Sequence, residues 1–116
     1  MTALLVVVGA AAGTALRHAW SVALDSRWPI GTLLANTVGS GLFGCFAALS
    51  LTDAGWALLG TGFCGAFTTF SSFAVQAVDR PPRQAAAYVL ATVVMTLGVC
   101  VLGWQLGSSL RGGLGD

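Results

Sequence analysis

The sequence predicts an all-α membrane protein with four transmembrane helices. Of its 116 residues, 56% are hydrophobic and only 8% are charged. A soluble domain of this size carries about a quarter charged residues, so this chain cannot cover itself with charge in water. The hydrophobic residues also gather in four stretches. Each has about 20 residues, the length of a helix that crosses a hydrocarbon core of about 30 Å.

Short polar segments separate the four stretches and mark the loops. We expect one domain, residues 1–116, with spans at about 2–22, 31–51, 56–78 and 85–107. Asp25 and Pro29 separate the first pair, Asp53 the second, and Asp79 to Arg83 the third. Pro29 suits the first turn of a helix, where its missing N–H is no loss. With four spans, both termini lie on the same side of the membrane.

The loops carry a weak signal of orientation. Arg27, Arg80 and Arg83 lie opposite the termini, whereas Arg111 lies on the terminal side. Positively charged loops tend to remain in the cytoplasm, and a chain that inserts in both orientations would show almost no such bias.

Small residues recur along the spans. Gly9 and Gly13 are four apart, and Gly41, Gly44 and Ala48 follow one another at spacings of three and four. Such faces let helix backbones approach closely. Because four short helices make a poor pore alone, we expect a dimer or a larger assembly.

The most informative segment is 65–73, which reads Gly-Ala-Phe-Thr-Thr-Phe-Ser-Ser-Phe inside the third stretch. The hydroxyls of Thr68, Thr69, Ser71 and Ser72 lower the local helix propensity and offer hydrogen bonds that lipid cannot use. Irregular backbone at membrane depth is tolerated only where protein or a water-filled cavity covers it. The segment therefore predicts that the third helix is broken near its middle and lines a site.

Two features of this break suit ions. Phe70 and Phe73 are three apart, so a helix points both rings the same way. They are either ordinary core or lipid-facing rings, or a pair whose positive edges contact a small anion. Edge contacts would bind the ion without trapping it, as conduction requires. Carbonyls freed around Gly65 and Thr68 need partners, and a cation with oxygen ligands would satisfy them.

Polar residues in the other spans allow two interpretations each. Asn36 either makes an interhelical hydrogen bond or presents N–H donors to an anion. Arg17 either snorkels to the headgroups or draws anions into an electropositive vestibule. Thr92 and Thr96, with Tyr88 one turn before them, either bond back to their own helix or form a polar track.

Several classes of function are disfavoured. The chain has no Lys and a net charge of +1, so we expect no nucleic-acid partner. Cys45, Cys64 and Cys100 lack the spacing of a zinc or redox motif. His18 has no partner motif for catalysis, and we expect no enzymatic activity.

These residues together resemble the CrcB/Fluc fluoride channels along essentially the whole chain. The resemblance rests on Gly13…Arg17, on Pro29-Ile-Gly-Thr32…Asn36-x-x-Gly39, and above all on Gly60-x-Gly-Phe-Cys-Gly65-x-Phe-Thr-Thr-Phe70-Ser-Ser-Phe73. The last motif is long and specific. The resemblance implies a channel in a bacterial inner membrane that exports cytoplasmic fluoride passively and confers fluoride resistance.

The resemblance also implies an assembly and a cofactor. Family members are antiparallel, dual-topology dimers with two narrow fluoride pores, made of two copies of one chain or completed by a paralogous subunit. A structural sodium ion at the dimer centre would be held by the main-chain carbonyls of Gly65 and Thr68 from each subunit.

Residue roles carry over by position. The fluoride pore would be lined by Asn36, Thr69, Phe70, Ser71, Ser72, Phe73, Thr92 and Thr96. Arg17 matches the arginine of the first helix, in the vestibule. Gln76 stands where many relatives carry Glu, so that carboxylate is missing from this chain.

The main alternative is a small four-helix multidrug/proton antiporter, which has a similar length and also dimerises. Such exporters couple to protons through a carboxylate inside the membrane. The acids of this chain, Asp25, Asp53, Asp79 and Asp116, all fall in predicted loops or in the tail. A non-transporting assembly subunit would explain the glycines but not the segment 65–73. The sequence therefore favours the channel.

Overall fold

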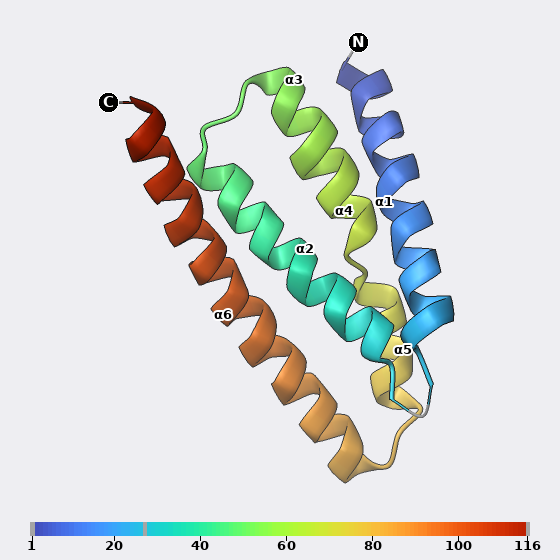
Figure 1. Cartoon of the computed structure of the whole chain (residues 1–116). Helices are drawn as coiled ribbons and strands as arrows, with labels where there is room; N and C mark the ends of the chain where they lie inside the picture. Colours follow the sequence, from blue (N-terminus) through green and yellow to red (C-terminus); the bar gives the residue numbers. More distant parts are fainter. Residues whose placement is uncertain (1, 27, 116) are drawn as a thin grey trace.

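The computed structural model describes residues 2–26 and 28–115, which form helices joined by short loops (Figure 1). The first two spans are α1 (Thr2–Leu24) and α2 (Ile30–Ala48), and the last is α6 (Pro82–Gly115). The third span is divided into α3 (Asp53–Gly55), the π-helix η1 (Trp56–Cys64), α4 (Gly65–Phe67) and α5 (Phe70–Val78). Within the described residues, four helical stretches are long and apolar enough to cross a membrane, which confirms the predicted all-α membrane fold with four spans.

The helix bounds differ from the predicted spans chiefly in the last helix. α6 begins at Pro82, whose missing N–H suits the first position of a helix, and it continues beyond residue 107 to Gly115. With 34 residues, α6 is about 51 Å long, well over the thickness of the hydrocarbon core. α2 stops earlier than predicted, because Ser50 adopts a left-handed φ of 54° and turns the chain.

Both termini lie at one end of the molecule, and the α1–α2 and α5–α6 connections lie at the other (Figure 1). An even number of spans brings the two termini to the same end. Arg80 and Arg83 therefore lie at the opposite end from Arg111, as predicted. Arg27 and Asp116, which entered the charge arguments above, lie outside the described residues.

α2 lies at the centre of the subunit. It packs along α6 on one side and against α1 and the third span on the other. α1 packs along η1 and α4, whereas α6 touches only α2 and α5 among the described helices. Within the described part of the chain, the first half of the third span therefore does not contact α6, and α2 lies between them and contacts both.

Glycines at the two main helix seams let the backbones touch. A Cβ on Gly13 of α1 would collide with the Phe63 carbonyl oxygen of η1, and Gly9 lies equally close to η1 one turn earlier. Across the α2–α6 seam, a Cβ on Gly103 would collide with the Gly41 carbonyl oxygen. The small-residue faces predicted from spacing are therefore used inside one subunit.

Candidate functional site

The third span is broken at two extended residues. Thr68 and Thr69, between α4 and α5, have ψ angles of 155° and 125°. Their hydroxyls stabilise the break from within. The Thr68 Oγ1 donates to the Cys64 carbonyl at 2.9 Å, and the Thr69 Oγ1 accepts from the Ser72 N–H at 3.3 Å as the N-cap of α5. The predicted break in the third helix is confirmed and lies at Thr68 and Thr69.

The helix before the break is wound more loosely than an α-helix. Residues Trp56–Cys64 form a π-helix, a form that is frequent at functional sites. The Gly65 N–H bonds to the Gly60 carbonyl in this register. A Cβ on Gly60 would lie 2.8 Å from the Trp56 ring, so glycine lets that ring pack on the helix backbone. The sequence did not predict this register, because its small residues also fit an α-helix.

Asn36 holds the break from the side of α2. Its Oδ1 accepts from the Thr69 N–H at 2.7 Å, and its Nδ2 donates to the Thr69 carbonyl at 3.0 Å. Asn36 therefore makes the interhelical hydrogen bond that was one of its two interpretations. Its amide nitrogen carries a second N–H that these two bonds do not use, so the other interpretation, a donor to an anion, remains open.

The break changes which donors its carbonyls can use. In an uninterrupted α-helix the Gly65 and Thr68 carbonyls would accept from the N–H groups four residues later, those of Thr69 and Ser72. These N–H groups donate instead to the Asn36 Oδ1 and the Thr69 Oγ1. The break therefore deprives the Gly65 and Thr68 carbonyls of their helical donors.

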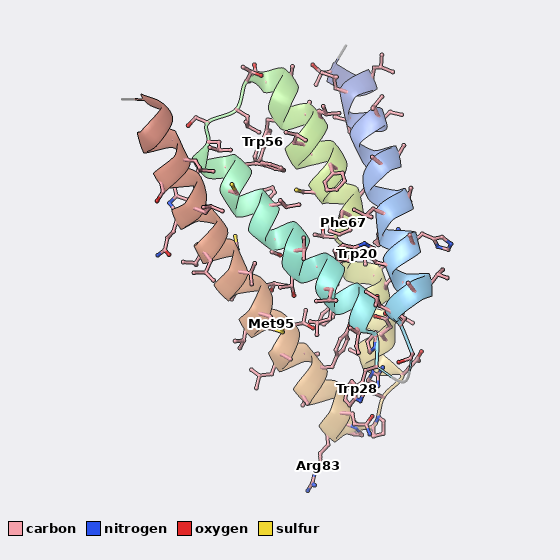
Figure 2. The ribbon with its side chains drawn as sticks, in the orientation of Figure 1. Trp20, Trp28, Trp56, Phe67, Arg83 and Met95 are labelled. Atoms are coloured by element: carbon pink, nitrogen blue, oxygen red, sulfur yellow. The ribbon has the colours of Figure 1, made fainter. Side chains whose placement is uncertain are left out.

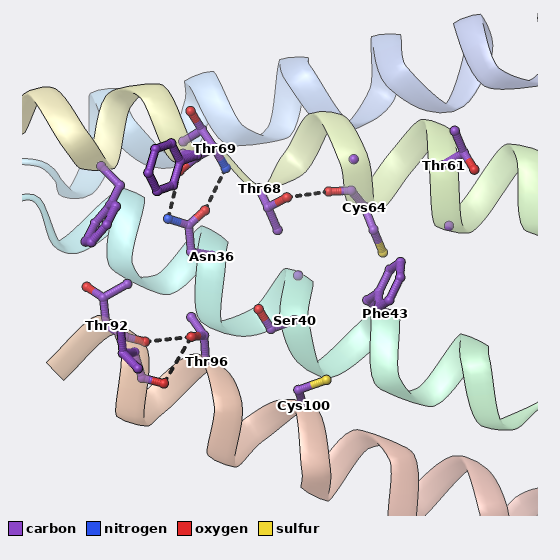
Figure 3. Close-up of a pocket in the computed structure, with 16 residues that line it drawn as sticks. Asn36, Ser40, Phe43, Thr61, Cys64, Thr68, Thr69, Thr92, Thr96 and Cys100 are labelled. Atoms are coloured by element: carbon purple, nitrogen blue, oxygen red, sulfur yellow. Dashed lines mark hydrogen bonds between the residues drawn. The ribbon is translucent and has the colours of Figure 1, made fainter. Parts of the chain in front are cut away.

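An open cleft of about 640 Å³ lies over α2, between the third span and α6 (Figure 3). The residues of the predicted site that line it are Asn36, Gly65, Thr68, Thr69, Phe70, Phe73, Thr92 and Thr96. The tertiary structure thus brings the break, the aromatic pair and the hydroxyls of the last helix to one place.

The cleft also has lining residues that were not predicted. Ser40 and Phe43 of α2, Thr61 of η1 and Cys100 of α6 contribute to its walls (Figure 3). The sequence spacing of Ser40 and Phe43 could have predicted their place in the cleft. They follow Asn36 by four and seven residues, which places all three on one face of α2.

The two predicted phenylalanine rings lie next to each other. The ring centroids of Phe70 and Phe73 are 5.9 Å apart, with planes tilted by 55°. Phe73 also packs on the Tyr88 ring of α6 at 5.3 Å, whereas Phe70 is 78% exposed. A ring this exposed at the edge of a cleft is available to contact an ion or a second subunit.

The hydroxyl groups of Tyr88, Thr92 and Thr96 do not all behave alike. The Thr96 Oγ1 donates back to its own helix, 2.7 Å from the Thr92 carbonyl and 3.2 Å from that of Val93. Tyr88 donates to the Gln76 Oε1 at 3.1 Å. Thr92 is only 6% exposed, and its Oγ1 has no hydrogen-bond partner among the described residues. An unpaired buried hydroxyl costs about 1–3 kcal/mol, so the Thr92 Oγ1 would gain more from a ligand than the Thr96 Oγ1, once a small side-chain movement exposes it to the cleft.

Three predicted site residues lie outside this cleft. Ser71 and Ser72 line a second hollow of about 280 Å³ together with Gln76. Arg17 is half-buried on α1, and its Nε donates to the Ala66 carbonyl at 3.2 Å. Its side chain is therefore bound to the backbone beside the break, and its vestibule role stays a prediction.

A hydrogen-bond network at the loop end of the spans was not predicted. The Gln76 Nε2 donates to the Thr32 Oγ1 at 3.2 Å, and Thr32 donates to the Asp25 carboxylate through its Oγ1 (3.4 Å) and its N–H (3.2 Å). At the same end, where Figure 2 labels Trp28, the Arg80 guanidinium lies 4.5 Å from the centre of this ring. Gln76 thus joins α5 to α2 without adding a negative charge.

The acidic residues that the structure describes lie at helix ends. Asp25 follows α1, Asp53 begins α3 and Asp79 follows α5. None of these three lines the cleft. The arrangement can offer hydroxyl, amide and ring-edge contacts to an anion, together with carbonyl oxygens for a cation.

Comparison with known families gives a match over nearly all of the chain. The family model described as CrcB-like protein, Camphor Resistance (CrcB), matches residues 4–104. The chain belongs to the CrcB family. Its matched part includes the whole break and every residue named above as lining the cleft. With its four candidate spans, this CrcB chain is a multi-pass membrane protein.

Curated relatives of this CrcB chain match most of its length. The fluoride-specific ion channel FluC 2 of Rhodococcus jostii is 40% identical, over 93% of this chain and 100% of the relative. FluC 1 of Thermobifida fusca is also 40% identical, over 89% of this chain and 92% of the relative. FluC 1 of Geobacillus kaustophilus is 35% identical, over 90% of this chain and 96% of the relative.

Proposed function

We propose that this protein is a fluoride-selective channel, not an enzyme, through which cytoplasmic fluoride leaves the cell down its electrochemical gradient, conferring fluoride resistance. The observation that carries the proposal is the cleft, where Asn36, the Phe70–Phe73 pair and Thr92 lie beside a broken membrane helix. The relatives that match most of the chain are named fluoride-specific ion channels, which supports fluoride as the anion.

The lining groups would replace the hydration shell of a small anion. Asn36 retains an N–H, and Thr92 has a buried hydroxyl with no partner within residues 2–26 and 28–115. Phe70 and Phe73 offer ring edges. None of these groups carries a full charge, so fluoride would bind weakly enough to leave again. A narrow pore, formed when a second subunit covers the cleft, would exclude the bulkier chloride ion.

The path would continue toward the loop end of the molecule. The hydroxyls of Thr69 and Ser71 lie 3.5 Å apart, and Ser71 and Ser72 line the hollow that includes Gln76. Thr96 would contribute as part of the α6 wall, although its hydroxyl is bonded within α6. Arg17 would add positive charge near the entrance.

A second subunit would cover the cleft in antiparallel orientation. The exposed Phe70 ring and the carbonyls of Gly65 and Thr68 border a cleft that is open in a single subunit. Polar backbone at membrane depth requires cover by protein or water. A dual-topology partner, either a second copy or a paralogous subunit, would supply that cover and generate two pores by symmetry.

A structural sodium ion would be held where the two subunits meet. Its ligands would be the Gly65 and Thr68 carbonyls of both chains, the oxygens that have lost their helical donors. Unwound carbonyls coordinate sodium in other membrane transport proteins. The ion would satisfy these oxygens and join the subunits. We propose the bacterial inner membrane as the location, because it separates cytoplasmic fluoride from the outside.

Efflux from liposomes that hold the purified protein tests the function. We expect fluoride to be released and chloride to be retained. Phe70→Ile should abolish the fluoride flux. Val78→Ile, which changes another strongly exposed residue of the same helix, should preserve it. Chloride that passes as readily as fluoride, or an unchanged flux in Phe70→Ile, would overturn the proposal.

The assembly and its cation are tested separately. We expect fluoride flux and dimer stability to fall when sodium is replaced by a bulky organic cation. If both are unchanged, the sodium site is wrong while the channel proposal stands. Expression of this chain alone then separates the two assemblies, because only a homodimer conducts without a paralogous subunit.

A further inference from the structure

We propose that Arg17 is a positioning residue, which holds the break in the third span and determines which carbonyls face the cleft. This role differs from attraction of anions in a vestibule, because it acts on the protein backbone. One of its two tests rests on the proposed sodium site, and the other does not.

The carbonyls around the break provide the first observation. Those of Gly65 and Thr68 have lost their helical donors, and both residues line the cleft. Ala66 does not line the cleft, and its carbonyl accepts from the Arg17 Nε at 3.2 Å. One guanidinium thus satisfies the carbonyl on the far side of α4 and leaves the other two for the cleft.

The close approach of α1 provides the second observation. Gly9, Gly13 and Arg17 are spaced by four residues, so they share one face of α1. At Gly13 there is no room for a Cβ beside the Phe63 carbonyl, so the two backbones are in contact. Arg17, one turn further along, therefore stands directly over α4. A bulkier face would hold α1 away and put the Ala66 carbonyl out of reach.

The aromatic residues beside Arg17 provide the third observation. Trp20 packs edge-on against Phe67 at 5.2 Å between α1 and the third span (Figure 2). Phe67 is only 1% exposed, so the residue after Ala66 is also fixed toward α1. Successive residues of a helix are about 100° apart, so rotation of α4 would change which of its residues line the cleft. Arg17 and Trp20 together prevent that rotation.

The break is therefore clamped from two directions. From α1, Arg17 binds the Ala66 carbonyl, and from α2, Asn36 binds both backbone groups of Thr69. An arginine inside a membrane span is costly unless a partner meets it, and such residues mark functional positions. Here the partner is a main-chain carbonyl next to the proposed cation ligands, which gives the arginine a structural reason to be there.

Three variants separate position from charge. Arg17→Met removes the donors and keeps much of the side-chain length. Arg17→Lys keeps a positive charge and a donor, since the lysine ammonium lies one bond beyond the position of Nε and can still reach the Ala66 carbonyl. Arg111→Met, at an exposed position near the end of α6, is the matched control.

The first test measures the sodium concentration that gives half-maximal fluoride efflux from liposomes. We expect Arg17→Met to raise it about tenfold, the factor that one charge-assisted hydrogen bond represents. Arg17→Lys and Arg111→Met should stay close to the wild type. Mere relief of the repulsion between a guanidinium and sodium would lower the value instead. With a sodium-dependent wild type, an unchanged or lowered value in Arg17→Met would overturn the inference, even if that variant is less stable.

The second test does not need the sodium site. In protein that carries 4-fluorophenylalanine in place of Phe70, the ¹⁹F resonance reports on the surroundings of the break. Arg17→Met should shift or split this resonance, Arg17→Lys should restore it, and Arg111→Met should leave it unchanged. If wild-type flux ignores sodium, the cation site is wrong, and a shifted resonance still supports Arg17. A resonance in Arg17→Met that matches the wild type would overturn the inference whatever sodium does.

Discussion

The two sides of the third span meet different surroundings. On its closed side, which faces α1, the backbone of Gly13 touches that of Phe63, and Phe67 is buried against Trp20. On its open side, which faces the cleft, Phe70 is 78% exposed. One helix thus completes its packing within the subunit on the closed side and leaves it unfinished on the open side.

The difference shows which side of the third span is fully packed within one subunit. Membrane helices associate through close packing and hydrogen bonds, because lipid tails are as apolar as the side chains they would replace. The closed side has both kinds of contact, so it should carry the stability of the subunit. The open side has polar groups that line the cleft and the strongly exposed ring of Phe70, so it should carry transport and assembly. Substitutions on the two sides should therefore have separable effects.

The largest effect is expected from Gly13→Val on the closed side. The new Cβ would collide with the Phe63 carbonyl oxygen, and a backbone atom cannot move aside as a flexible side chain can. We expect no monodisperse protein by size-exclusion chromatography. Gly98→Val in α6 is the control, because nothing lies within 4 Å of a Cβ there. Normal assembly of Gly13→Val would show that the seam is less tight than described.

The matched pair Phe67→Ile and Phe70→Ile compares the two sides directly. Phe67 is 1% exposed and stacks on Phe63 at 5.4 Å, so Phe67→Ile should lower the free energy of unfolding by about 2–4 kcal/mol. Phe70→Ile should leave the unfolding of the subunit nearly unchanged. Equilibrium unfolding in detergent measures the free energy of unfolding of both variants. Equal losses of stability in the two variants would contradict the division into closed and open sides.

Asn36→Leu should have an intermediate effect, since Asn36 belongs to both functions. It binds the backbone of Thr69 and also lines the cleft. Leucine would leave the Thr69 N–H without its partner, at a cost of about 1–3 kcal/mol. We expect a lower melting temperature together with loss of fluoride flux. A stable variant with wild-type flux would show that the α2 clamp is dispensable.

The smallest change in stability is expected from Thr92→Val, with Thr96→Val as its counterpart. Thr92→Val removes a buried hydroxyl that has no partner among the residues the structure describes, so stability should be unchanged or higher by about 1 kcal/mol, while fluoride flux falls. Thr96→Val removes a hydroxyl that bonds within α6, so flux should persist. Fluoride flux through liposomes is measured for both variants. Loss of flux in Thr96→Val but not in Thr92→Val would show that Thr96, and not Thr92, lines the polar path.

Local properties of the sequence predicted much of the fold and part of the site. Four apolar stretches gave four spans, because partition into a bilayer depends on each segment alone. The break fell at Thr68 and Thr69, because their hydroxyls can bond to nearby backbone groups and stabilise extended conformations there. The spacing of Phe70 and Phe73 likewise placed their rings together.

Other features depended on contacts that no local pattern contains. The spacing of Thr92 and Thr96 was the same under either interpretation. Only the packed helices show that Thr96 bonds within its helix while the Thr92 hydroxyl has no partner in the described part of the chain. Ser71 and Ser72, adjacent to the aromatic pair in sequence, line a separate hollow. The π-helical register before the break had no signal among its small residues.

What the sequence determined by itself is therefore the set of membrane helices, the position of the break and the kinds of group beside it. The tertiary structure decided which of these groups are already satisfied. Asn36 bonds to Thr69 across 33 positions, and Arg17 bonds to Ala66 across 49. A hydrogen bond of this kind needs a donor and an acceptor within about 3 Å of each other, and the packing of all the helices together sets that distance.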